Sequence, residues 1–481
     1  MKQILLDLLV TYEQWIIVYL FVINSVYFLL LVVGFFELLR YRYAEREKRD
    51  VLERSTLMPP ISVLVPSHNE AALISEAVRA LLRLRYPEFE VIVVNDGSSD
   101  ETLQLLIREF HLYKSARYYE TKLATQPVRA LYESMNPIPL VVVDKENGGK
   151  ADALNAGLNI ARYPLICAVD ADSLLEADAL ARVAKPFVEE PGRVLAVGGI
   201  VRVANGCDTH AGRVDQVRLP RSWLARVQVV EYLRAFLGGR IAFSSFNSLL
   251  VISGAFGLFQ KAAVLAIGGF RTSTVGEDME IIIRLHRWAR REGKPYRIVF
   301  QPDPVCWTQV PETLRVLRRQ RNRWQRGTIE SLWLHRSMIG RPRYGVLGLL
   351  VMPFFVLFEM LGPLVEVAGY FLTLAGFCAG VLSWNIALAF FFASALYGTI
   401  LSAASVILEE LSTRRYPEVR SLLTLVAASV IENLGFRQLL TLWRALAFID
   451  VFRGKKAWGA MERKGWARGA AHGEPAVSSL K

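Results

Sequence analysis

Two carboxylates stand one residue apart where an apolar stretch ends. Leu165 to Val169 is an apolar run typical of a buried strand, and Asp170 and Asp172 follow it. Because side chains alternate along an extended chain, both carboxylates point the same way. Like charges on one face repel unless a cation lies beside them, and a divalent ion with oxygen ligands is the usual one. The alternative is a helix cap ahead of a helix predicted over Leu174 to Val188, which explains one carboxylate only.

Other polar residues also follow predicted strands. Apolar runs at 61–67, 90–94 and 140–143 are each followed by a helical pattern. Strands alternating with helices predict a mostly parallel sheet with helices on both faces, and ligands bind such sheets at the carboxyl ends of the strands. The polar residues at those ends are Ser67, His68, Asp96, Asp144, Asp170 and Asp172. This edge is acidic and suits a ligand that carries a metal.

Asp96 and Lys150 favour a nucleotide as that ligand. Asp96 follows a strand, where a carboxylate can accept hydrogen bonds from a base or a ribose, although Asn-Asp-Gly-Ser is also ordinary turn chemistry. Lys150 begins a predicted helix after two glycines, where backbone amides and an ammonium suit phosphate. The alternative for Lys150 is a solvated surface lysine.

Two later segments carry further candidates. Ser253 and Gly254 lie in a stretch where glycine lets another molecule approach the backbone, or where a strand bulges. Glu277 and Asp278 open a helix predicted from Met279 to Arg291. A carboxylate at a helix start is either a cap or, where it reaches a substrate hydroxyl, a general base.

A cationic helix is predicted from Pro311 to His335. Gln320, Arg323 and Trp324 share one face of it, at spacings of three and four residues. An arginine can bind a diphosphate through two hydrogen bonds, and a tryptophan offers a flat surface for a sugar ring. The alternative is an amphipathic helix lying on anionic lipid, and both descriptions can hold for different faces.

Hydrophobic residues make up 53% of the 481 residues, and the excess lies at the two ends of the chain. Trp15 to Leu39 contains a single charged residue and is long enough to span a bilayer. Further apolar runs follow at 345–361, 363–383, 386–408 and 421–450. We expect 345–361 to be re-entrant or interfacial, and 421–450 to form a short hairpin or to lie along the membrane surface.

The formal net charge is +12, with basic clusters beside the first and last apolar stretches. By the positive-inside rule these clusters, and the domain between them, face the cytoplasm. The sequence therefore predicts a multi-pass protein of the plasma or inner membrane that also contacts lipid. Nucleic acid is excluded as a partner, because the basic residues gather next to membrane segments. The four cysteines show no metal or disulfide spacing and are expected to be buried thiols.

Six motifs occur in a specific order along the chain. They are Val-Pro-Ser-His-Asn-Glu at 65–70, Asn-Asp-Gly-Ser-Ser-Asp at 95–100, Gly-Gly-Lys-Ala-Asp-Ala-Leu-Asn at 148–155, Asp-Ala-Asp at 170–172, Gly-Glu-Asp at 276–278 and Gln-Arg-Asn-Arg-Trp at 320–324. The set resembles the membrane-integrated family 2 glycosyltransferases, which include cellulose, hyaluronan and poly-N-acetylglucosamine synthases. The resemblance covers about 56–343 and the flanking spans.

The resemblance implies an α/β GT-A fold and a domain organisation. We expect a transmembrane helix and basic segment at 1–55, the GT-A domain at 56–310 and an amphipathic interface helix at 311–343. Transmembrane or re-entrant helices at 344–452 and a basic cytoplasmic tail at 453–481 complete the chain. The tail is too short for a cyclic-dinucleotide module of the bacterial cellulose synthase type.

The resemblance also implies roles for individual residues. Asp278 would be the catalytic base. The donor would be bound by Ser67, His68, Asp96, Lys150, Asp170 and Arg323. The acceptor would be bound by Ser253, Gly254, Glu277, Gln320 and Trp324. Asp172 and Asp170 would hold Mg²⁺ or Mn²⁺.

Two positions depart from the family pattern. Relatives often carry Tyr or Phe at the place of His68, which puts stacking on the base in doubt. The residue before the Glu-Asp pair is commonly Thr, and Gly276 stands there instead.

The predicted function is an inverting transfer of sugar from a UDP-sugar, with UDP-N-acetylglucosamine as the favoured donor, to a growing polysaccharide that is then translocated. Glu359 or Glu366 would line the path of the product, because isolated charges in apolar stretches usually face a cavity. The alternatives are a nonprocessive transfer of one sugar to a lipid carrier, and an inactive channel or scaffold. The resemblance does not identify accessory subunits.

Overall fold

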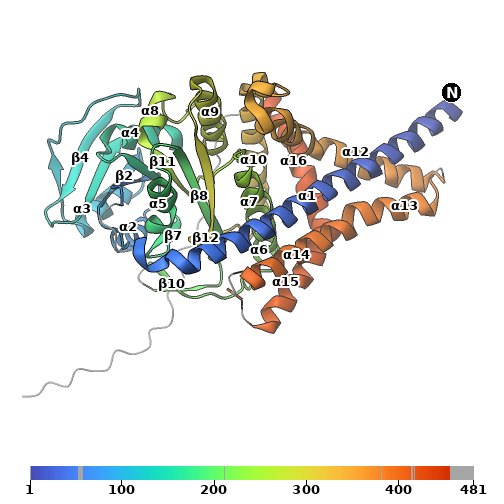
Figure 1. The fold of residues 1–481 in the computed structure, drawn as a ribbon, viewed down its shortest axis with the longest axis horizontal. Helices are drawn as coiled ribbons and strands as arrows, with labels where there is room; N and C mark the ends of the chain where they lie inside the picture. Colours follow the sequence, from blue (N-terminus) through green and yellow to red (C-terminus); the bar gives the residue numbers. More distant parts are fainter. Residues whose placement is uncertain are drawn as a thin grey trace, which may run out of the picture.

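The computed structural model describes residues 2–52, 58–210, 212–380, 382–412, 415–416 and 418–454. The predicted basic tail lies outside the described residues from residue 455 onward. Figure 1 shows an α/β domain and, beside it, a group of long apolar helices that project from it. The two parts meet along α10 (Leu314–Leu334), α16 (Arg437–Phe452) and α1 (Lys2–Leu52).

Four parallel strands form one half of the central sheet, as predicted. They are β5 (Leu140–Lys145), β2 (Phe89–Asp96), β1 (Ile61–Ser67) and β6 (Leu165–Val169), in that spatial order. Nearly all their residues are buried, because helices cover both faces and continuous apolar runs suit such strands. Parallel register brings the carboxyl ends of these strands to one edge.

The rest of the ten-stranded sheet is mainly antiparallel, so the prediction of a mostly parallel sheet is wrong for this half. β3 (Leu112–Ser115) and β4 (Val128–Ser134) extend it beyond β5. On the other side follow β11 (Phe256–Gln260), β8 (Val194–Val203), β12 (Arg297–Thr308) and β7 (Ser173–Leu175), with β8 and β12 parallel. A separate small sheet pairs β9 (Asp208–His210) with β10 (Arg213–Gln216).

The helix predicted from Leu174 begins later than expected. Residues 173–175 form β7, which pairs with β12, and the helix α5 runs from Ala179 to Glu189. Pairing with β12 is a long-range contact that overrides local helical preference, and local sequence cannot reveal it.

Helices pack on both faces of the sheet. The domain helices are α2 (Ile74–Leu82), α3 (Thr102–Glu109), α4 (Lys150–Ile160), α5, α8 (Lys261–Ala266) and α9 (Glu277–Glu292). Between the sheet and the apolar helices lie α6 (Trp223–Leu233), the π-helical segment η1 (Arg234–Arg240), α7 (Ile241–Ser245) and α10.

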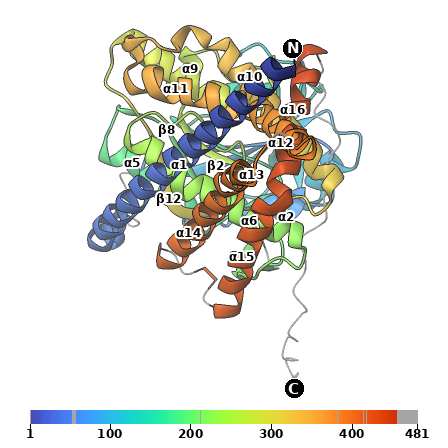
Figure 2. The ribbon, with the colours of Figure 1, turned by 90° about the vertical axis from the view of Figure 1, so that its right-hand side faces the viewer.

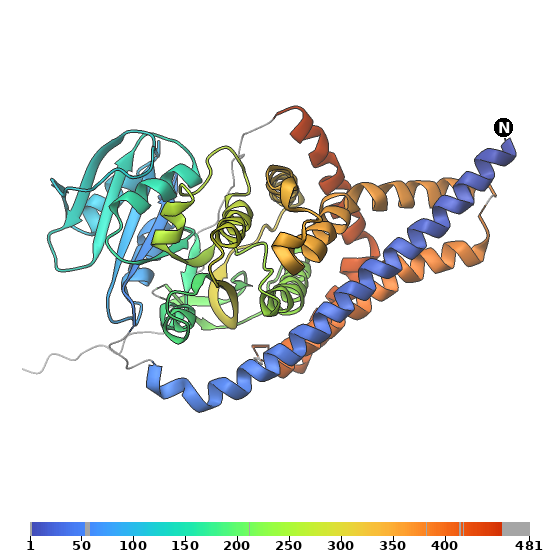
Figure 3. The same ribbon diagram turned by 45° about the horizontal axis from the view of Figure 1, so that its top comes forward.

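Within the described part of the chain, three helices are long and apolar enough to cross a membrane: Thr11–Tyr43, Trp384–Leu411 and Val419–Phe452. The first covers the span predicted from Trp15. Its carboxyl-terminal half continues along the α/β domain and packs on η1 and α7. Figures 2 and 3 show that its amino-terminal half runs beside α12 (Gly362–Cys378), α13 (Trp384–Phe391) and α14 (Tyr397–Ser412).

The segment at 347–378 is broken. The helix Leu347–Met360 and α12 meet at a bend of 42°, which fits either one interrupted span or the expected re-entrant segment. The first half consists of η4 (Leu347–Val351), α11 (Met352–Phe354) and η5 (Phe355–Met360), and the short turns η2 (Arg336–Met338) and η3 (Pro342–Tyr344) precede it. Cys378, at the end of α12, is exposed, whereas the other three cysteines are buried as expected.

The last stretch is bent and does not form the expected hairpin. α15 (Val419–Ile431) continues through η7 (Glu432–Phe436) into α16 across non-helical backbone at Leu434 and Gly435. α16 then packs against α10 and α12. The alternative of a surface position for 421–450 stays a prediction.

Candidate active site

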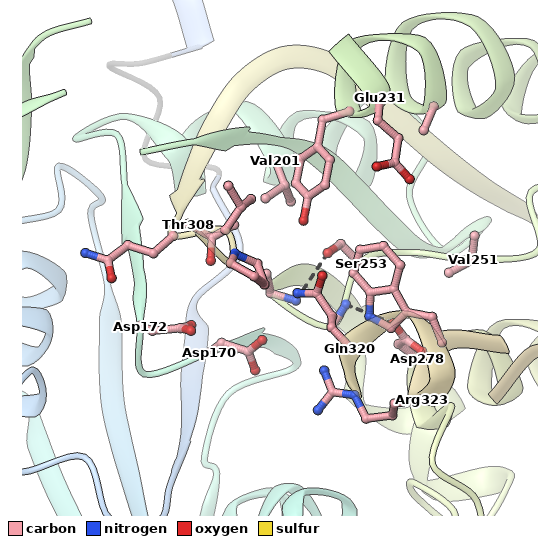
Figure 4. Close-up of a pocket in the computed structure, with 18 of the residues that line it drawn as sticks. Asp170, Asp172, Val201, Glu231, Val251, Ser253, Asp278, Thr308, Gln320 and Arg323 are labelled. Atoms are coloured by element: carbon pink, nitrogen blue, oxygen red, sulfur yellow. Dashed lines mark hydrogen bonds between the residues drawn. The ribbon is translucent and has the colours of Figure 1, made fainter. Parts of the chain in front are cut away.

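A cavity of about 720 Å³ lies at the edge of the sheet, between the start of α9, the helix α10, and the segment formed by α6 and η1. Ten of the thirteen predicted site residues line it: Lys150, Asp170, Asp172, Ser253, Gly254, Glu277, Asp278, Gln320, Arg323 and Trp324. Figure 4 shows Asp170, Asp278 and Arg323 facing this hollow from three different elements. Five segments that are distant in sequence therefore converge there.

Lys150 joins the two sides of the cavity. At the start of α4, its ammonium lies 2.5 Å from Asp170 and 3.5 Å from Glu277, and it donates a hydrogen bond of 3.0 Å to the carbonyl of Gly254. Burial alone would lower the pKa of Lys150, but Asp170 and Glu277 outweigh burial and raise it. The lysine is therefore a fixed cation rather than the solvated side chain of the alternative interpretation.

Asp170 and Asp172 follow β6 and line the same cavity, as the alternating pattern predicted. Burial, together with the nearby charge of Asp170, raises the pKa of Asp172. The ionised pair is therefore costly without a cation beside it.

A divalent cation fits these residues if the ligand supplies part of the shell. No cluster of three or more His, Cys, Asp or Glu side chains could hold a metal by itself among the described residues. Two carboxylates with phosphate oxygens, by contrast, are a common set for Mg²⁺ or Mn²⁺.

Asp278 is held at the start of α9 by two backbone amides. Gly254 N donates to one carboxylate oxygen at 3.2 Å, and Met279 N donates to the other at 2.8 Å. A Cβ at position 254 would lie 2.8 Å from the Lys150 ammonium and 3.5 Å from Asp278, so glycine is required for this approach. The cap and base interpretations of Asp278 are compatible, because the capped carboxylate still lines the cavity.

Gly276 explains one departure from the family pattern. A Cβ at this position would lie 2.7 Å from the Cα of Gly327, so the start of α9 rests directly on the backbone of α10. Glu330 of α10 also accepts hydrogen bonds from Thr274 Oγ1 at 2.8 Å and Val275 N at 2.9 Å. The helix that carries Trp324 thus also fixes the segment that carries Asp278.

One face of the Trp324 ring is covered by an arginine. The Arg321 guanidinium lies 4.3 Å from the centre of its ring, and Glu231 of α6 holds Arg321 at 2.7 Å. Trp324 remains 40% exposed, which leaves indole surface available in the cavity. Gln320, one turn earlier, is buried, and its Oε1 accepts no hydrogen bond from the described residues.

Ser67, His68 and Asp96 do not line this cavity, although they lie at the carboxyl ends of the neighbouring strands β1 and β2. The Asp96 carboxylate is 3% exposed and accepts hydrogen bonds from Lys145 at 2.6 Å, Gly148 N at 2.9 Å and Gly149 N at 2.7 Å. His68 Nδ1 lies 2.8 Å from the carbonyl of Asp96. Asp96 therefore shapes the glycine loop before Lys150, and its contact with a nucleotide stays a prediction.

Sequence reasoning missed a second wall of the cavity. Glu231, Tyr232, Phe236 and Arg240 line it from α6 and η1. No motif marks them, and the only signal is the presence of charged residues in the otherwise apolar run Trp223 to Phe243. Lys145 was also missed; it is fully buried between Asp96 and Asp152, at 2.6 Å from each.

Glu359 and Glu366 do not line the cavity. Glu359 accepts a hydrogen bond from Tyr27 and pairs with Arg444 at 3.0 Å. Glu366 lies 3.8 Å from Arg437 and accepts a hydrogen bond from Tyr370 at 3.2 Å. These carboxylates link neighbouring helices, and their place on a product path stays a prediction.

Two family descriptions match the chain. Residues 165–405 match glycosyl transferase family group 2, and residues 62–132 match glycosyl transferase family 2. The first match includes the cavity residues from Asp170 to Trp324, and the second includes Ser67, His68 and Asp96; Lys150 lies between the two.

Curated relatives agree with these families. A poly-beta-1,6-N-acetyl-D-glucosamine synthase of Staphylococcus aureus is 31% identical over 314 residues, or 65% of this chain and 64% of that protein. The synthase of the same name from Staphylococcus epidermidis is 30% identical over 272 residues, or 56% and 55% of the two chains. The chain thus spans somewhat less than two thirds of the length of the curated relatives it matches.

One solved structure supports the fold. A mannosyltransferase from Pyrobaculum calidifontis, in complex with GDP-Man and Mn²⁺, matches 86% of this chain and 99% of its own, with a TM-score of 0.50 and 20% identity. At this identity the likeness concerns the fold, and the predicted GT-A architecture is confirmed.

Proposed function

We propose that this chain, which belongs to the family 2 glycosyltransferases, extends a β-linked polysaccharide by transferring sugar from a UDP-sugar, with UDP-N-acetylglucosamine as the donor. One observation carries the proposal. Lys150 contacts Asp170 and the carbonyl of Gly254 together, while Gly254 N holds Asp278. The residues assigned to the donor and the residue assigned to the acceptor hydroxyl are thus tied into one cluster.

In this proposal Asp278 takes the proton of the acceptor hydroxyl as its oxygen attacks the anomeric carbon. The bond from that carbon to the diphosphate breaks on the opposite face, so configuration inverts and UDP leaves. Lys150 and Arg323 oppose the negative charge that builds on the diphosphate. Mg²⁺ or Mn²⁺ held by Asp170 and Asp172 would add further charge stabilisation when bound.

The remaining assignments follow the same division. Ser67, His68 and Asp96, at the ends of β1 and β2, bind the base and ribose in this proposal. Ser253, Gly254, Glu277 and Gln320 line the cavity, and we assign them to the acceptor sugar, which would stack on Trp324.

The apolar helices favour a membrane enzyme. Three described helices are long and apolar enough to span a bilayer, and α10 lies between them and the sheet. We propose that the α/β domain faces the cytoplasm and that the polymer leaves through the membrane, because the basic clusters flank the spans.

The direct test uses purified protein in detergent with a panel of radiolabelled nucleotide sugars, with and without EDTA. Transfer from UDP-N-acetylglucosamine into products of many lengths, lost with EDTA and restored by Mn²⁺ or Mg²⁺, supports the proposal. A single glycolipid product would support the alternative, transfer of one sugar to a lipid carrier. Absence of transfer from every donor would contradict both.

A further inference from the structure

Arg240 is a cation in the cavity wall that forms no ion pair with any of the described residues. It ends η1 and lines the cavity with Asp278 and Trp324. Its guanidinium carbon lies 3.9 Å from the centre of the Phe236 ring. Within the described parts of the chain it makes no side-chain hydrogen bond or salt bridge, and its Nη1 is buried without a partner.

Other arginines of the same region are paired. Arg234, six residues earlier, lies 2.7 Å from Glu432 and 2.6 Å from Ser402, and Arg321 lies 2.7 Å from Glu231. A buried donor that lacks a partner is unfavourable, and more so when it is charged. Burial accordingly lowers the pKa of Arg240 to about 10, which still leaves it charged at neutral pH.

The segment that carries Arg240 is held firmly. Phe236 stacks near Tyr232 and Phe300, with ring centres 5.8 and 6.0 Å away. On its other side η1 rests on α1, where a Cβ at Gly34 would lie 2.5 Å from the carbonyl of Leu237. The position of the guanidinium is therefore set by the fold before any ligand arrives.

We propose that Arg240 binds an oxygen of the substituent on the acceptor sugar, and so selects an acceptor that carries such a group. If the proposed function holds, that oxygen is the carbonyl of an N-acetyl group; a carboxylate of an acidic sugar would offer the same chemistry. A guanidinium presents planar donors that suit either oxygen. This inference rests on the proposed division of the cavity into a donor side and an acceptor side.

The neighbours of Arg240 favour the acceptor over the diphosphate. The Lys150 ammonium lies beside Asp170, and the positive charge of Arg323 favours the ionised form of Asp172. The donor side therefore has its own cations. Arg240 instead shares its surroundings with Asp278 and Tyr232. Tyr232 also lines the cavity, and its hydroxyl makes no hydrogen bond to the described residues.

The test compares acceptors in binding and in transfer, using the full chain in detergent. The probes are a β-linked N-acetylglucosamine pentasaccharide, its de-N-acetylated form, and a uronate-containing pentasaccharide. Binding is measured by calorimetry without donor, so that it does not depend on the identity of the donor. The variants are Arg240→Gln and Arg240→Lys, with Arg221→Gln as the matched control, because Arg221 is exposed outside the cavity.

We expect Arg240→Gln to weaken binding of the N-acetylated acceptor about tenfold or more, which is the loss of one charged hydrogen bond. Binding of the de-N-acetylated form, of UDP, and the melting temperature should stay unchanged. A selective loss with the uronate acceptor instead identifies a carboxylate as the bound group. Arg240→Lys should retain part of the affinity, and Arg221→Gln all of it.

Three results would overturn the inference: an equal loss with all acceptors, a weaker affinity for UDP, or no binding of any acceptor to the wild-type protein. A fall in melting temperature with no change in acceptor preference would show a structural role, which also overturns it. Failure of the proposed function looks different, because the wild-type protein would then transfer nothing from UDP-N-acetylglucosamine while acceptor selection by Arg240 could still be measured.

Discussion

The two sides of the cavity region are built in different ways. At the ends of β1, β2 and β5, polar groups mostly bind one another: Asp96 binds Lys145 and two amides, and Asn95 Nδ2 donates to Asp144 at 2.8 Å. On the side of α6 and α10, Gln320 Oε1 and Arg240 Nη1 are buried without partners among the described residues. The exceptions on the strand side are Ser67 Oγ and Asn95 Oδ1, which are also buried without partners among the described residues.

The difference indicates that the two sides of the cavity region have different functions. The strand-end side is a prearranged frame whose charged groups Asp96, Asp144 and Lys145 are paired within the fold itself, so it can receive a nucleotide with little rearrangement. The helical side keeps hydrogen-bonding groups unsatisfied until a ligand arrives, and such sites discriminate strongly between ligands. Changes on the first side should mostly affect stability, and changes on the second should mostly affect catalysis and acceptor use.

The largest expected effect is that of Asp278→Asn. Asparagine keeps the shape of the side chain and one oxygen, which can accept from one of the two amides that now bind different carboxylate oxygens, those of Gly254 and Met279, so the fold and donor affinity should persist. Loss of the base should lower kcat about a thousandfold or more. Radiolabel transfer and calorimetric UDP binding measure the two quantities. Transfer at the wild-type rate would mean that the base lies elsewhere.

The next largest effect should be a loss of stability, and it should be similar in the two variants Asp96→Asn and Asp152→Asn. Each carboxylate lies 2.6 Å from the fully buried Lys145, and each change breaks one half of a buried charge cluster at a cost of about 3 kcal/mol. Both variants should therefore show similarly lowered melting temperatures by differential scanning fluorimetry.

UDP affinity separates the two roles of Asp96. If Asp96 serves only the frame, both variants bind UDP alike, measured at a temperature where both are folded. A weaker UDP affinity in Asp96→Asn alone would show that its carboxylate also contacts the nucleotide, as proposed for the donor site, and that the frame and the nucleotide contact share one residue.

The same division explains what could be predicted from the sequence. Asp170, Asp172 and Lys150 follow regular strand and loop patterns, and parallel pairing carries such residues to one edge, so periodicity alone located them. Asp278 and Trp324 were found because their motifs are specific, not because local sequence shows that α9 and α10 touch. Arg240 and Glu231 could not be found, because their importance depends on pairings and contacts across the cavity. The antiparallel half of the sheet was missed for the same reason.

A smaller effect is expected from restoring the family residue in Gly276→Thr. Its Cβ would lie 2.7 Å from Gly327 Cα, and neither backbone can move without shifting α9 against α10. Overpacking of this kind costs about 1–3 kcal/mol, and the shift should also displace Asp278 from Trp324. We expect a lower melting temperature and a reduced kcat with UDP affinity unchanged.

The double variant Gly276→Ala with Gly327→Ala checks this explanation. Each Cβ faces the other backbone, so the double change should be at least as harmful as either single change. Full activity in Gly276→Thr would show that the close approach is not needed and that the helical side tolerates more movement than we infer.

The smallest effect should come from Glu231→Gln, which keeps the shape of the side chain but removes the charge that holds Arg321. Arg321 can then leave the face of Trp324, and the indole becomes less well fixed. Because Trp324 itself remains, we expect a KM for the acceptor several-fold higher, shorter products, and unchanged kcat and UDP affinity.

Arg321→Gln should produce the same change, and the double variant should add little, since both act through one contact. The matched control is Arg336→Gln, because Arg336 stacks on Trp333 of the same helix outside the cavity. Additive losses from Glu231 and Arg321 would mean that Glu231 contacts the acceptor directly, and the second wall would then bind the substrate through more than Arg240.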